Sequence, residues 1–374
     1  MKFLFWAAAG WVAYTYIGYV CWLRLRMLWR FRPVLRGSAT PSISIVMVVR
    51  NEEQTLEAKL QNLRGLDYPA EQCQIVIVSD GSTDRTEEIL REYGRDSRIQ
   101  VVLNQLPRGK ASGLNDAIEL AGGEIVVFTD VRQKIEPSAV RRLMENFADP
   151  EVGCVSGELM LGNPGLGESG QGVGLYWRLE KQVRELEAAS GSVVGATGAL
   201  YAVRRNLLTS IPQGTILDDV YIPMQVVRQR KRVVFDERAR AWDDPNLGND
   251  REFARKVRTL SGNYQLLQLA PWLLSDSNPI RFEFVSHKLL RLTIPLALGA
   301  LLLTSLGLKG GFYRAVLALQ LAFYGLSALA LTGITKRGIL SRVADTAGAF
   351  VMLNGAAMVA LANFVTGKRT AWTR

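Results

Sequence analysis

The chain has 374 residues, 48% of them hydrophobic, and a net charge of +10. This basic excess does not indicate nucleic-acid binding, because arginines cluster directly after an apolar N-terminal stretch, where the positive-inside rule and anionic lipid headgroups favour them. The single histidine, His287, excludes metal sites made of several histidines, and three widely spaced cysteines indicate a reduced cytosolic domain. We therefore expect membrane lipids, and no nucleic acid, as partners. The clustered arginines are Arg24, Arg26, Arg30, Arg32 and Arg36.

Residues 4–23 carry no charge over about the length that crosses a bilayer. Only Lys2 precedes this run, and the basic flank follows it, unlike the arrangement in a cleaved signal peptide. We interpret residues 1–26 as a retained transmembrane anchor, with its N-terminus outside and the following domain in the cytosol. The alternative is a buried core helix.

Short apolar runs that alternate with amphipathic stretches begin at Ser42. This alternation predicts right-handed β-α-β crossovers and a mostly parallel sheet, hence an α/β domain over residues 40–262. Neither a G-x-G-x-x-G nor a Walker A signature follows a predicted strand, which argues against dinucleotide oxidoreductases and P-loop enzymes. The predicted strands are 42–49, 74–79, 99–104 and 124–129, and the predicted helices are 53–64, 84–94, 110–121 and 137–147.

The apolar run 124–129 stops at Asp130, at the carboxyl end of a predicted interior strand. Open α/β sheets bind ligands beyond these strand ends, so Asp130 is a site candidate before it is a solvated turn residue. Residues 228–232 belong to a strongly basic stretch that we interpret as a membrane-facing surface. We also predict a strand at 152–161, a glycine-rich loop at 162–174, a helix at 175–190 and an acidic helix start at 218–219.

The last third of the chain is again apolar. Aromatic and aliphatic residues at 263–290 suggest an interfacial segment lying along the membrane, and residues 291–374 form a C-terminal membrane region of two or three helices. The runs 292–308 and 315–333 predict a helical hairpin through the bilayer. A third run, 347–366, either spans or is interfacial, because spanning would place the basic residues that follow it outside.

Five short stretches lie near predicted strand or helix ends: V-V-R-N-E-E at 48–53, D-G-S-T-D at 80–84, T-D-V-R at 129–132, G-A-T-G-A at 195–199 and D-D at 218–219. In this order they resemble the family 2 glycosyltransferases, in the membrane-integrated branch that includes cellulose, hyaluronan and poly-N-acetylglucosamine synthases. The resemblance covers residues 42–260. It implies a GT-A fold and an inverting enzyme that uses a nucleotide-diphosphate sugar, with UDP as the expected nucleotide.

The resemblance also assigns a donor site. It implies that Val49, Arg50, Glu52 and Asp80 surround the nucleotide, with the Asp80 carboxylate against the base, although Arg50 could equally be a surface charge. By contrast, Asp84 with Glu87 is interpreted as a helix-capping pair. Lys110, at a predicted helix start, either neutralises phosphate or is solvated.

The family's D-x-D motif, which holds a divalent cation against the diphosphate, here reads Asp130-Val131-Arg132. We expect a weakened Mg²⁺ or Mn²⁺ site built on Asp130 alone, with Arg132 near the phosphates or the acceptor. The opposing hypothesis is a metal-independent or degenerate enzyme.

On the acceptor side, the resemblance implies that Gly195, Ala196, Thr197 and Gly198 line the acceptor sugar. Inverting transfer needs a carboxylate that deprotonates the acceptor hydroxyl. The order of the motifs implies that Asp219 is this base and Asp218 its neighbour. An aspartate pair also suits a helix N-terminus, and the two interpretations are compatible.

The Q-x-x-R-W signature of processive synthases is missing, and Arg255 and Arg258 occupy the corresponding region as candidate diphosphate ligands. We therefore expect transfer to a lipid-linked or glycan acceptor in envelope or exopolysaccharide synthesis, by a multi-pass protein of the cytoplasmic (inner) membrane with its catalytic domain in the cytosol. A processive synthase is the first alternative. A non-catalytic nucleotide-sugar-binding assembly subunit, suggested by Arg132, is the second. The oligomeric state, the sugar and the linkage stay open.

Overall fold

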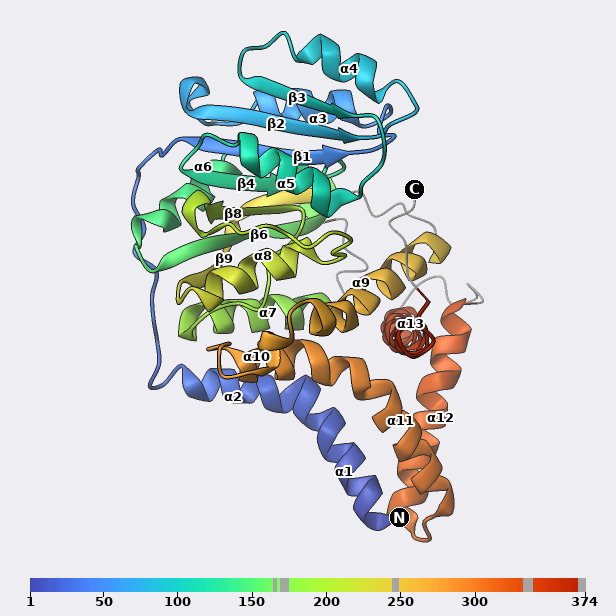
Figure 1. Ribbon diagram of the computed structural model, residues 1–374. Helices are drawn as coiled ribbons and strands as arrows, with labels where there is room; N and C mark the ends of the chain where they lie inside the picture. Colours follow the sequence, from blue (N-terminus) through green and yellow to red (C-terminus); the bar gives the residue numbers. More distant parts are fainter. Residues whose placement is uncertain (164–166, 169–174, 244–248, 332–338, 369–374) are drawn as a thin grey trace.

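A single sheet forms the centre of the domain (Figure 1). The structure is a computed structural model that describes residues 1–163, 167–168, 175–243, 249–331 and 339–368. The sheet has nine strands in the order β3-β2-β1-β4-β8-β6-β9-β5, with β7 paired to β6. The strands are β1 (Ile43–Val49), β2 (Cys73–Asp80), β3 (Ile99–Asn104), β4 (Ile125–Thr129), β5 (Lys134–Ile135), β6 (Val152–Asn163), β7 (Gly167–Glu168), β8 (Leu200–Arg204) and β9 (Arg232–Asp243).

The half of the sheet made by β3, β2, β1 and β4 is parallel, as the alternating pattern predicts. Strand β1 is buried along its whole length, which is why it has no polar-out alternation. The crossover helices also begin and end within three residues of the predicted bounds. They are α3 (Leu56–Arg64), α4 (Thr86–Tyr93), α5 (Lys110–Leu120) and α6 (Ala139–Glu145).

The other half of the sheet corrects the expectation of a mostly parallel arrangement. Strand β8 is antiparallel to both β4 and β6, while β6 and β9 are parallel, so the sheet is mixed. Strand β9 lies inside the basic stretch that masks its apolar alternation. Arg232, which we expected on a membrane-facing surface, is buried and donates hydrogen bonds to the carbonyl oxygens of Arg32 and Ala188. That expectation was wrong for this residue.

Helices α7 (Leu175–Ser190), α8 (Asp218–Arg228) and α9 (Asn249–Leu269) lie between the sheet and the apolar helices (Figure 1). The bounds of α7 and the start of α8 match the prediction. The glycine-rich loop expected at 162–174 lies largely outside the described residues. Cys73 and Cys154 are buried and free, as expected for a reduced domain.

Four helical stretches of the described chain are long and apolar enough to cross a membrane: Lys2–Arg26, Arg281–Gly307, Gly311–Ala330 and Val343–Val365. The first comprises α1 (Lys2–Ala13), a π-helical turn (Tyr14–Gly18) and α2 (Tyr19–Arg26), and α1 packs against α11. The third apolar run thus has the length of a span. The C-terminal helices are α10 (Arg281–Phe284), α11 (Leu290–Gly307), α12 (Gly311–Leu331) and α13 (Ile339–Val365).

The segment predicted to lie along the membrane has a mixed character. Leu273 and Phe284 are buried in the main core, whereas Leu274 and Phe282 are exposed. A short 3₁₀ helix, Pro271–Leu274, joins α9 to α10, and a π-helical turn, Val285–Leu289, continues α10 into α11. The interfacial placement and the other domain boundaries stay predictions.

Candidate functional site

Four predicted site residues meet at the carboxyl end of β4. Lys110 begins α5, Asp130 follows β4, and Asp218 and Asp219 begin α8. The Lys110 ammonium lies 3.0 Å from Asp130 Oδ1 and 3.2 Å from Asp218 Oδ2. One cation therefore joins the D-x-D position to the predicted catalytic pair, although these residues are up to 109 positions apart in the sequence (219 minus 110).

The loop of residues 195–199 holds Asp219 in place. The Gly198 backbone N–H donates to Asp219 Oδ2 at 3.1 Å, and the Ala196 N–H donates to the Asp219 carbonyl oxygen at 2.7 Å. Gly195 has φ +84°, where a side chain would be strained, and Thr197 donates its N–H to Ser156 Oγ at 3.1 Å. The four predicted loop residues thus lie directly beside the carboxylates.

Gly198 leaves a space between two of these carboxylates. A Cβ built on Gly198 would lie 3.3 Å from Asp219 Oδ2 and 3.6 Å from Asp130 Oδ2. Both oxygens therefore face the position that a side chain at 198 would fill. The space is polar and negatively charged, which suits a cation or a hydroxyl donor.

Burial and the neighbouring carboxylates raise the pKa values of Asp218 and Asp219. Burial raises the pKa of Asp219 to about 6, and the charges of Asp218 and Asp130 add to this, while Lys110 opposes it. Burial also raises the pKa of Asp218, and Lys110 again counteracts the shift. Burial alone would lower the pKa of Lys110, but the surrounding carboxylates raise it, so the lysine is charged.

The predicted nucleotide loop after β1 is fixed to the loop after β2. Asn51 has φ +52°, donates its N–H to Ser82 Oγ at 3.2 Å, and accepts from the Thr83 N–H at 2.8 Å. The Glu52 N–H donates to Thr86 Oγ1. Sequence reasoning missed Asn51, although asparagine is a residue type that tolerates this left-handed conformation. Val49, the last residue of β1, is buried, and Arg50, the first residue after the strand, is half-buried.

Asp80, the last residue of β2, binds backbone N–H groups of the turn before α5. It is 0% exposed, and its two carboxylate oxygens accept from the backbone N–H groups of Arg108 and Gly109 at 2.7 and 2.9 Å. Asp80 therefore holds the turn that presents Lys110. Contact of Asp80 with a nucleotide base stays a prediction. Asp84 Oδ1 accepts from the N–H of Thr86, the first residue of α4, so Asp84 contacts the helix start as expected. The pairing with Glu87 is not seen among the described residues, since Glu87 accepts from Arg91.

Two predicted phosphate ligands share one carboxylate. Arg132 Nη2 lies 3.6 Å and Arg255 Nη1 3.8 Å from Asp243 Oδ2, at the end of β9. The Gln133 amide donates to the same oxygen at 2.9 Å. Arg258 lies one turn further along α9 and is half-buried. Sequence reasoning missed Asp243, which gives Arg132 a carboxylate partner within the protein.

A buried lysine supports the turn that carries Asp130. Lys59 of α3 is 3% exposed, and its ammonium donates to Thr129 Oγ1 at 2.9 Å and to the Gln133 carbonyl oxygen at 2.6 Å. Burial lowers the pKa of Lys59 to about 7, and Asp130 opposes the shift. Thr129 in turn donates to the Ala199 carbonyl oxygen at 2.9 Å. Lys59 thus ties both sides of the site together, and its place on an amphipathic helix gave no signal of this.

Comparison with known proteins identifies the domain that carries these residues. Residues 44–211 match the family described as glycosyl transferase family 2. The chain contains a family 2 glycosyltransferase domain. This match includes Lys110, Asp130 and the loop of residues 195–199, and it ends before Asp218.

The relatives of this glycosyltransferase domain make glycolipids and polysaccharides. The chain is 25% identical over 236 residues to the beta-monoglucosyldiacylglycerol synthase of Synechocystis sp., covering 59% of this chain and 49% of the relative. It is 24% identical over 241 residues to the poly-beta-1,6-N-acetyl-D-glucosamine synthase of Staphylococcus epidermidis, covering 62% and 56%. The chain thus spans about half the length of the curated relatives it matches.

A solved structure confirms the GT-A type of fold. The mannosyltransferase PcManGT from Pyrobaculum calidifontis, in complex with GDP-Man and Mn²⁺, superimposes with a TM-score of 0.73 at 19% identity. The match covers 98% of this chain and 100% of that one, so it extends over the glycosyltransferase domain and the apolar helices.

Proposed function

We propose that the chain is a membrane-anchored inverting glycosyltransferase that moves a sugar from a nucleotide-diphosphate donor, with UDP as the expected nucleotide, to a membrane-associated acceptor. The observation that carries the proposal is the contact of Lys110 with both Asp130 and Asp218, next to Asp219 and Gly198. This arrangement combines a cation for the departing diphosphate with a partly exposed carboxylate of raised pKa.

Asp219 is the proposed base. Its pKa of about 6 lets it be ionised at neutral pH and still basic enough to accept a proton. It removes the proton from the acceptor hydroxyl as the oxygen attacks the anomeric carbon, and the nucleoside diphosphate leaves from the opposite face. The hydrogen bond from Gly198 orients the carboxylate, and Asp218 holds Lys110.

The residues fit a divalent cation in part. Oxygen ligands of carboxylates are those that Mg²⁺ and Mn²⁺ prefer, and Asp130 and Asp219 each turn an oxygen toward the space above Gly198. The described residues contain no group of three candidate metal ligands, so the protein by itself forms no complete cage. Asp130 would hold the ion together with the donor's diphosphate, and the ion would neutralise phosphate charge.

Arg132 and Arg255 lie at the diphosphate side of the proposed site. Their shared partner Asp243 keeps both guanidinium groups near the end of β9, with Arg132 two residues from Asp130. Released from Asp243, either group can donate paired hydrogen bonds to phosphate. Val49, Arg50, Glu52 and Asp80 are proposed to surround the nucleoside.

The acceptor is proposed to be a lipid-linked sugar or a growing glycan at the cytoplasmic face of the membrane. Support comes from the four apolar helices and from relatives whose names state a glycolipid product and a polysaccharide product. Gly195, Ala196, Thr197 and Gly198 are the proposed acceptor contacts, because small residues let a sugar ring approach the Asp219 carboxylate.

The test measures nucleotide release from a panel of nucleotide sugars by the purified chain in lipid, with and without Mn²⁺. Asp219→Asn should reduce turnover by about 10²–10⁴-fold, the usual contribution of a general base. Asp276→Asn, which alters an exposed aspartate, is the control. Silence of the wild type toward every donor would instead support the nucleotide-sugar-binding subunit, the candidate that Arg132 suggests.

A processive synthase is the second enzymatic candidate, favoured by the match to the poly-beta-1,6-N-acetyl-D-glucosamine synthase. Radiolabelled product separated by size distinguishes the two. A ladder of products supports repeated addition, and a single product supports transfer of one sugar.

A further inference from the structure

Helix α13 has the length of a membrane span, but it does not run in the same direction as its apolar neighbours. In Figure 1, α11 and α12 run down the page, away from the sheet, whereas α13 is seen end-on. Membrane-spanning helices tilt by about 20° on average from the bilayer normal. A helix that lies across a spanning hairpin therefore fits the surface of the bilayer better than its interior.

The hairpin of α11 and α12 defines two levels of the molecule. Its connection, residues 308–310, lies farthest from the sheet (Figure 1). Beside the connection, Phe312 and Tyr313 of α12 contact Phe5 of α1, with ring centroids 6.1 and 4.9 Å apart. We call this end the distal level, and we call the opposite end, where α11 begins and α12 ends, the proximal level.

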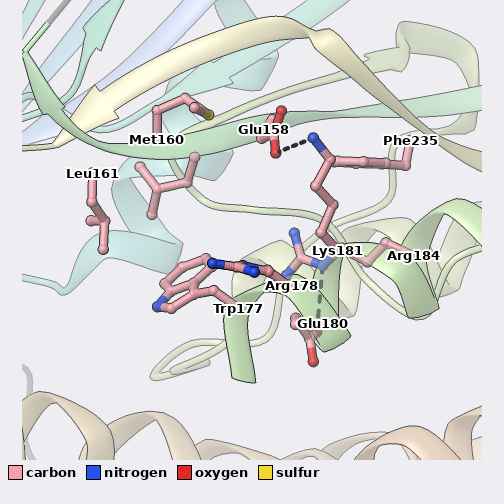
Figure 2. A pocket seen from close by; sticks show the side chains of 10 residues that line it. Glu158, Met160, Leu161, Trp177, Arg178, Glu180, Lys181, Arg184 and Phe235 are labelled. Atoms are coloured by element: carbon pink, nitrogen blue, oxygen red, sulfur yellow. Dashed lines mark ion pairs between the residues drawn. The ribbon is translucent and has the colours of Figure 1, made fainter. Parts of the chain in front are cut away.

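The start of α11 is attached to the glycosyltransferase domain. Arg291 is ion-paired with Glu180 of α7, which lines a pocket of about 280 Å³ between α7 and β6 (Figure 2). His287 Nε2 also lies 2.9 Å from Glu180 Oε1. Leu292 is 15 positions from the end of α11 (307 minus 292), or about 22 Å from the connection at 1.5 Å per residue. Arg291 and Leu292 therefore mark the proximal level.

The second half of α13 lies at the proximal level. Ala360 packs in one buried cluster with Leu292 of α11 and Tyr264 of α9. The ring of Phe364 stacks on that of Tyr264, with centroids 5.0 Å apart. Leu266, also of α9, is fully buried in the core that contains the sheet. The end of α13 thus contacts a helix that is packed onto the glycosyltransferase domain.

The first half of α13 lies beside the proximal end of α12. Gly348 faces Ala330, since a Cβ built on Gly348 would lie 3.3 Å from the Ala330 Cβ. The rings of Phe350 and Phe323 meet edge to face, with centroids 5.5 Å apart. Ala330 is 19 positions from the start of α12 (330 minus 311), or about 28 Å from the connection. Gly348 is therefore at the proximal level too.

These contacts exclude a large change of level along α13. The helix advances about 24 Å between Gly348 and Phe364, which are 16 positions apart (364 minus 348). The hydrocarbon core of a bilayer is about 30 Å thick, so a span would carry Phe364 most of the way to the distal level. Phe364 instead contacts α9, and Gly348 contacts the end of α12. Both halves of α13 therefore stay at one level.

The exposed side chains of α13 suit the surface of a bilayer. Val343, Met358 and Val365 are exposed and lie on one face of the helix, because separations of 15 and 22 positions are close to whole numbers of turns. Asp345 near the start of the helix and Lys368 after its end are exposed as well. A helix at the interface buries such an apolar face in lipid and lets charged groups near its ends reach water.

We propose that α13 lies along the bilayer surface beneath the glycosyltransferase domain, with the lipid headgroups and upper acyl chains as its partner. Among the described residues, the chain then crosses the bilayer only through Lys2–Arg26, α11 and α12. Lys368 stays on the side of the domain, as the positive-inside rule favours for a cytosolic domain.

This placement also supports the helix that holds the segment before the proposed base. Gln265 of α9 accepts from the Ile216 N–H at 2.9 Å and donates to the Gly214 carbonyl oxygen at 2.8 Å, shortly before Asp218. A helix α13 resting on the leaflet would therefore hold the site of transfer at a fixed height above the lipid. That an acceptor comes from this leaflet rests on the proposed function, whereas the placement of α13 does not.

The experiment labels single cysteines with a membrane-impermeant maleimide, before and after permeabilisation of bacterial spheroplasts that contain the full chain with Cys21→Ser. The reporters are Lys134→Cys for the glycosyltransferase domain, Lys309→Cys for the distal level, and Lys368→Cys or Thr366→Cys for the end of α13. We expect permeabilisation to raise the labelling of the domain reporter and of both α13 reporters at least tenfold. Labelling of Lys309→Cys should not change.

Two labelling results would overturn the proposal. If Lys368→Cys follows Lys309→Cys instead of Lys134→Cys, α13 spans the bilayer. If Lys309→Cys follows Lys134→Cys, the hairpin that defines the two levels does not cross the bilayer. Cys73 and Cys154 are buried and should stay unlabelled in every variant, which checks that each variant is folded.

A depth measurement separates a helix along the surface from one that enters the bilayer and returns. Spin labels at Val343, Met358 and Val365, read by collision with oxygen and with a water-soluble nickel complex in vesicles, should have depths that agree within about 5 Å, one helical turn. Exposed positions of α12 are the control, and Leu319 should be deeper than Phe312. A depth profile of α13 that peaks at Met358 would overturn the proposal. Loss of transfer with the expected labelling and depths would count against the proposed function alone.

Discussion

Two clusters of charged residues in this protein use the same kinds of group in opposite ways. Around Lys110, one ammonium faces the carboxylates of Asp130, Asp218 and Asp219 at a partly exposed edge of the sheet. Around His287, the ring nitrogens contact Glu180 and Glu187 at 2.9 Å each, and all three residues are buried. The first cluster has surplus negative charge, and the second is closely paired.

The His287 cluster connects α2, α7 and the apolar stretch Arg281–Gly307. Tyr19 of α2 donates to Glu187 Oε1 at 2.7 Å, and the Val194 N–H donates to Glu187 Oε2 at 3.2 Å. Arg26 forms an ion pair with Glu283 and donates to Ser190 Oγ. Paired and buried charges of this kind fix how elements meet, whereas the unbalanced cluster keeps its groups available for a ligand.

The largest expected effect is a loss of activity without a loss of stability when a carboxylate of the Lys110 cluster is removed. Asp219→Asn should reduce turnover by about 10²–10⁴-fold. It should also leave the free energy of unfolding unchanged or slightly higher at pH 7, because it removes one of three mutually repelling carboxylates. Steady-state nucleotide release and denaturant titration on the same preparation check this. A clear loss of stability would show that Asp219 stabilises the fold, as the charged residues of the His287 cluster do.

In the His287 cluster, we expect a substitution to lower stability and to leave activity nearly unchanged. His287→Phe should lower the free energy of unfolding by about 3–5 kcal/mol, because it leaves two buried glutamates without a shared partner. The remaining folded protein should release nucleotide at close to the wild-type rate. Leu296→Phe, at an exposed position on the same helical stretch, is the control and should change neither quantity. Unchanged stability of His287→Phe would contradict the account.

Lys59 tests the support beneath the Lys110 cluster. Lys59→Met removes the hydrogen bonds to Thr129 and Gln133, which should misplace Asp130 and reduce kcat/KM about tenfold, or about 1.4 kcal/mol. Because a charged lysine is costly to bury, stability at pH 7 should fall little. Lys134→Met, an exposed lysine on β5, is the matched control. Equal kinetics of the two variants would remove Lys59 from the site.

The smallest effect concerns Arg132. Arg132→Asp exchanges a cation beside Asp243 for a carboxylate and should reduce turnover about fivefold, the scale of a partly exposed ion pair. Arg132→Lys should retain most activity. Turnover measured across a range of Mn²⁺ concentrations checks both variants. A rise in metal-dependent turnover in Arg132→Asp would mean that arginine weakens the site instead of serving it.

The parallel half of the fold was predictable because its strands are continuous apolar runs and its helices are amphipathic. The mixed half was not, since basic residues such as Arg232 hide β9 and their burial depends on carbonyl partners from distant segments. Order along the chain placed Lys110, Asp130 and Asp219 in one site. The sequence did not predict the roles of Asp243, Asn51 or Lys59, because these roles depend on contacts with residues from distant segments.

The pH dependence of transfer tests the central claim most directly. Because Asp219 must be ionised to accept a proton and its pKa is raised to about 6, kcat/KM should be full above that pH and fall about tenfold per unit below it. In Asp219→Asn the residual activity should lose this acid limb. An acid limb near pH 4 in the wild type, or one near pH 6 that persists in Asp219→Asn, would contradict the assignment of Asp219 as the base.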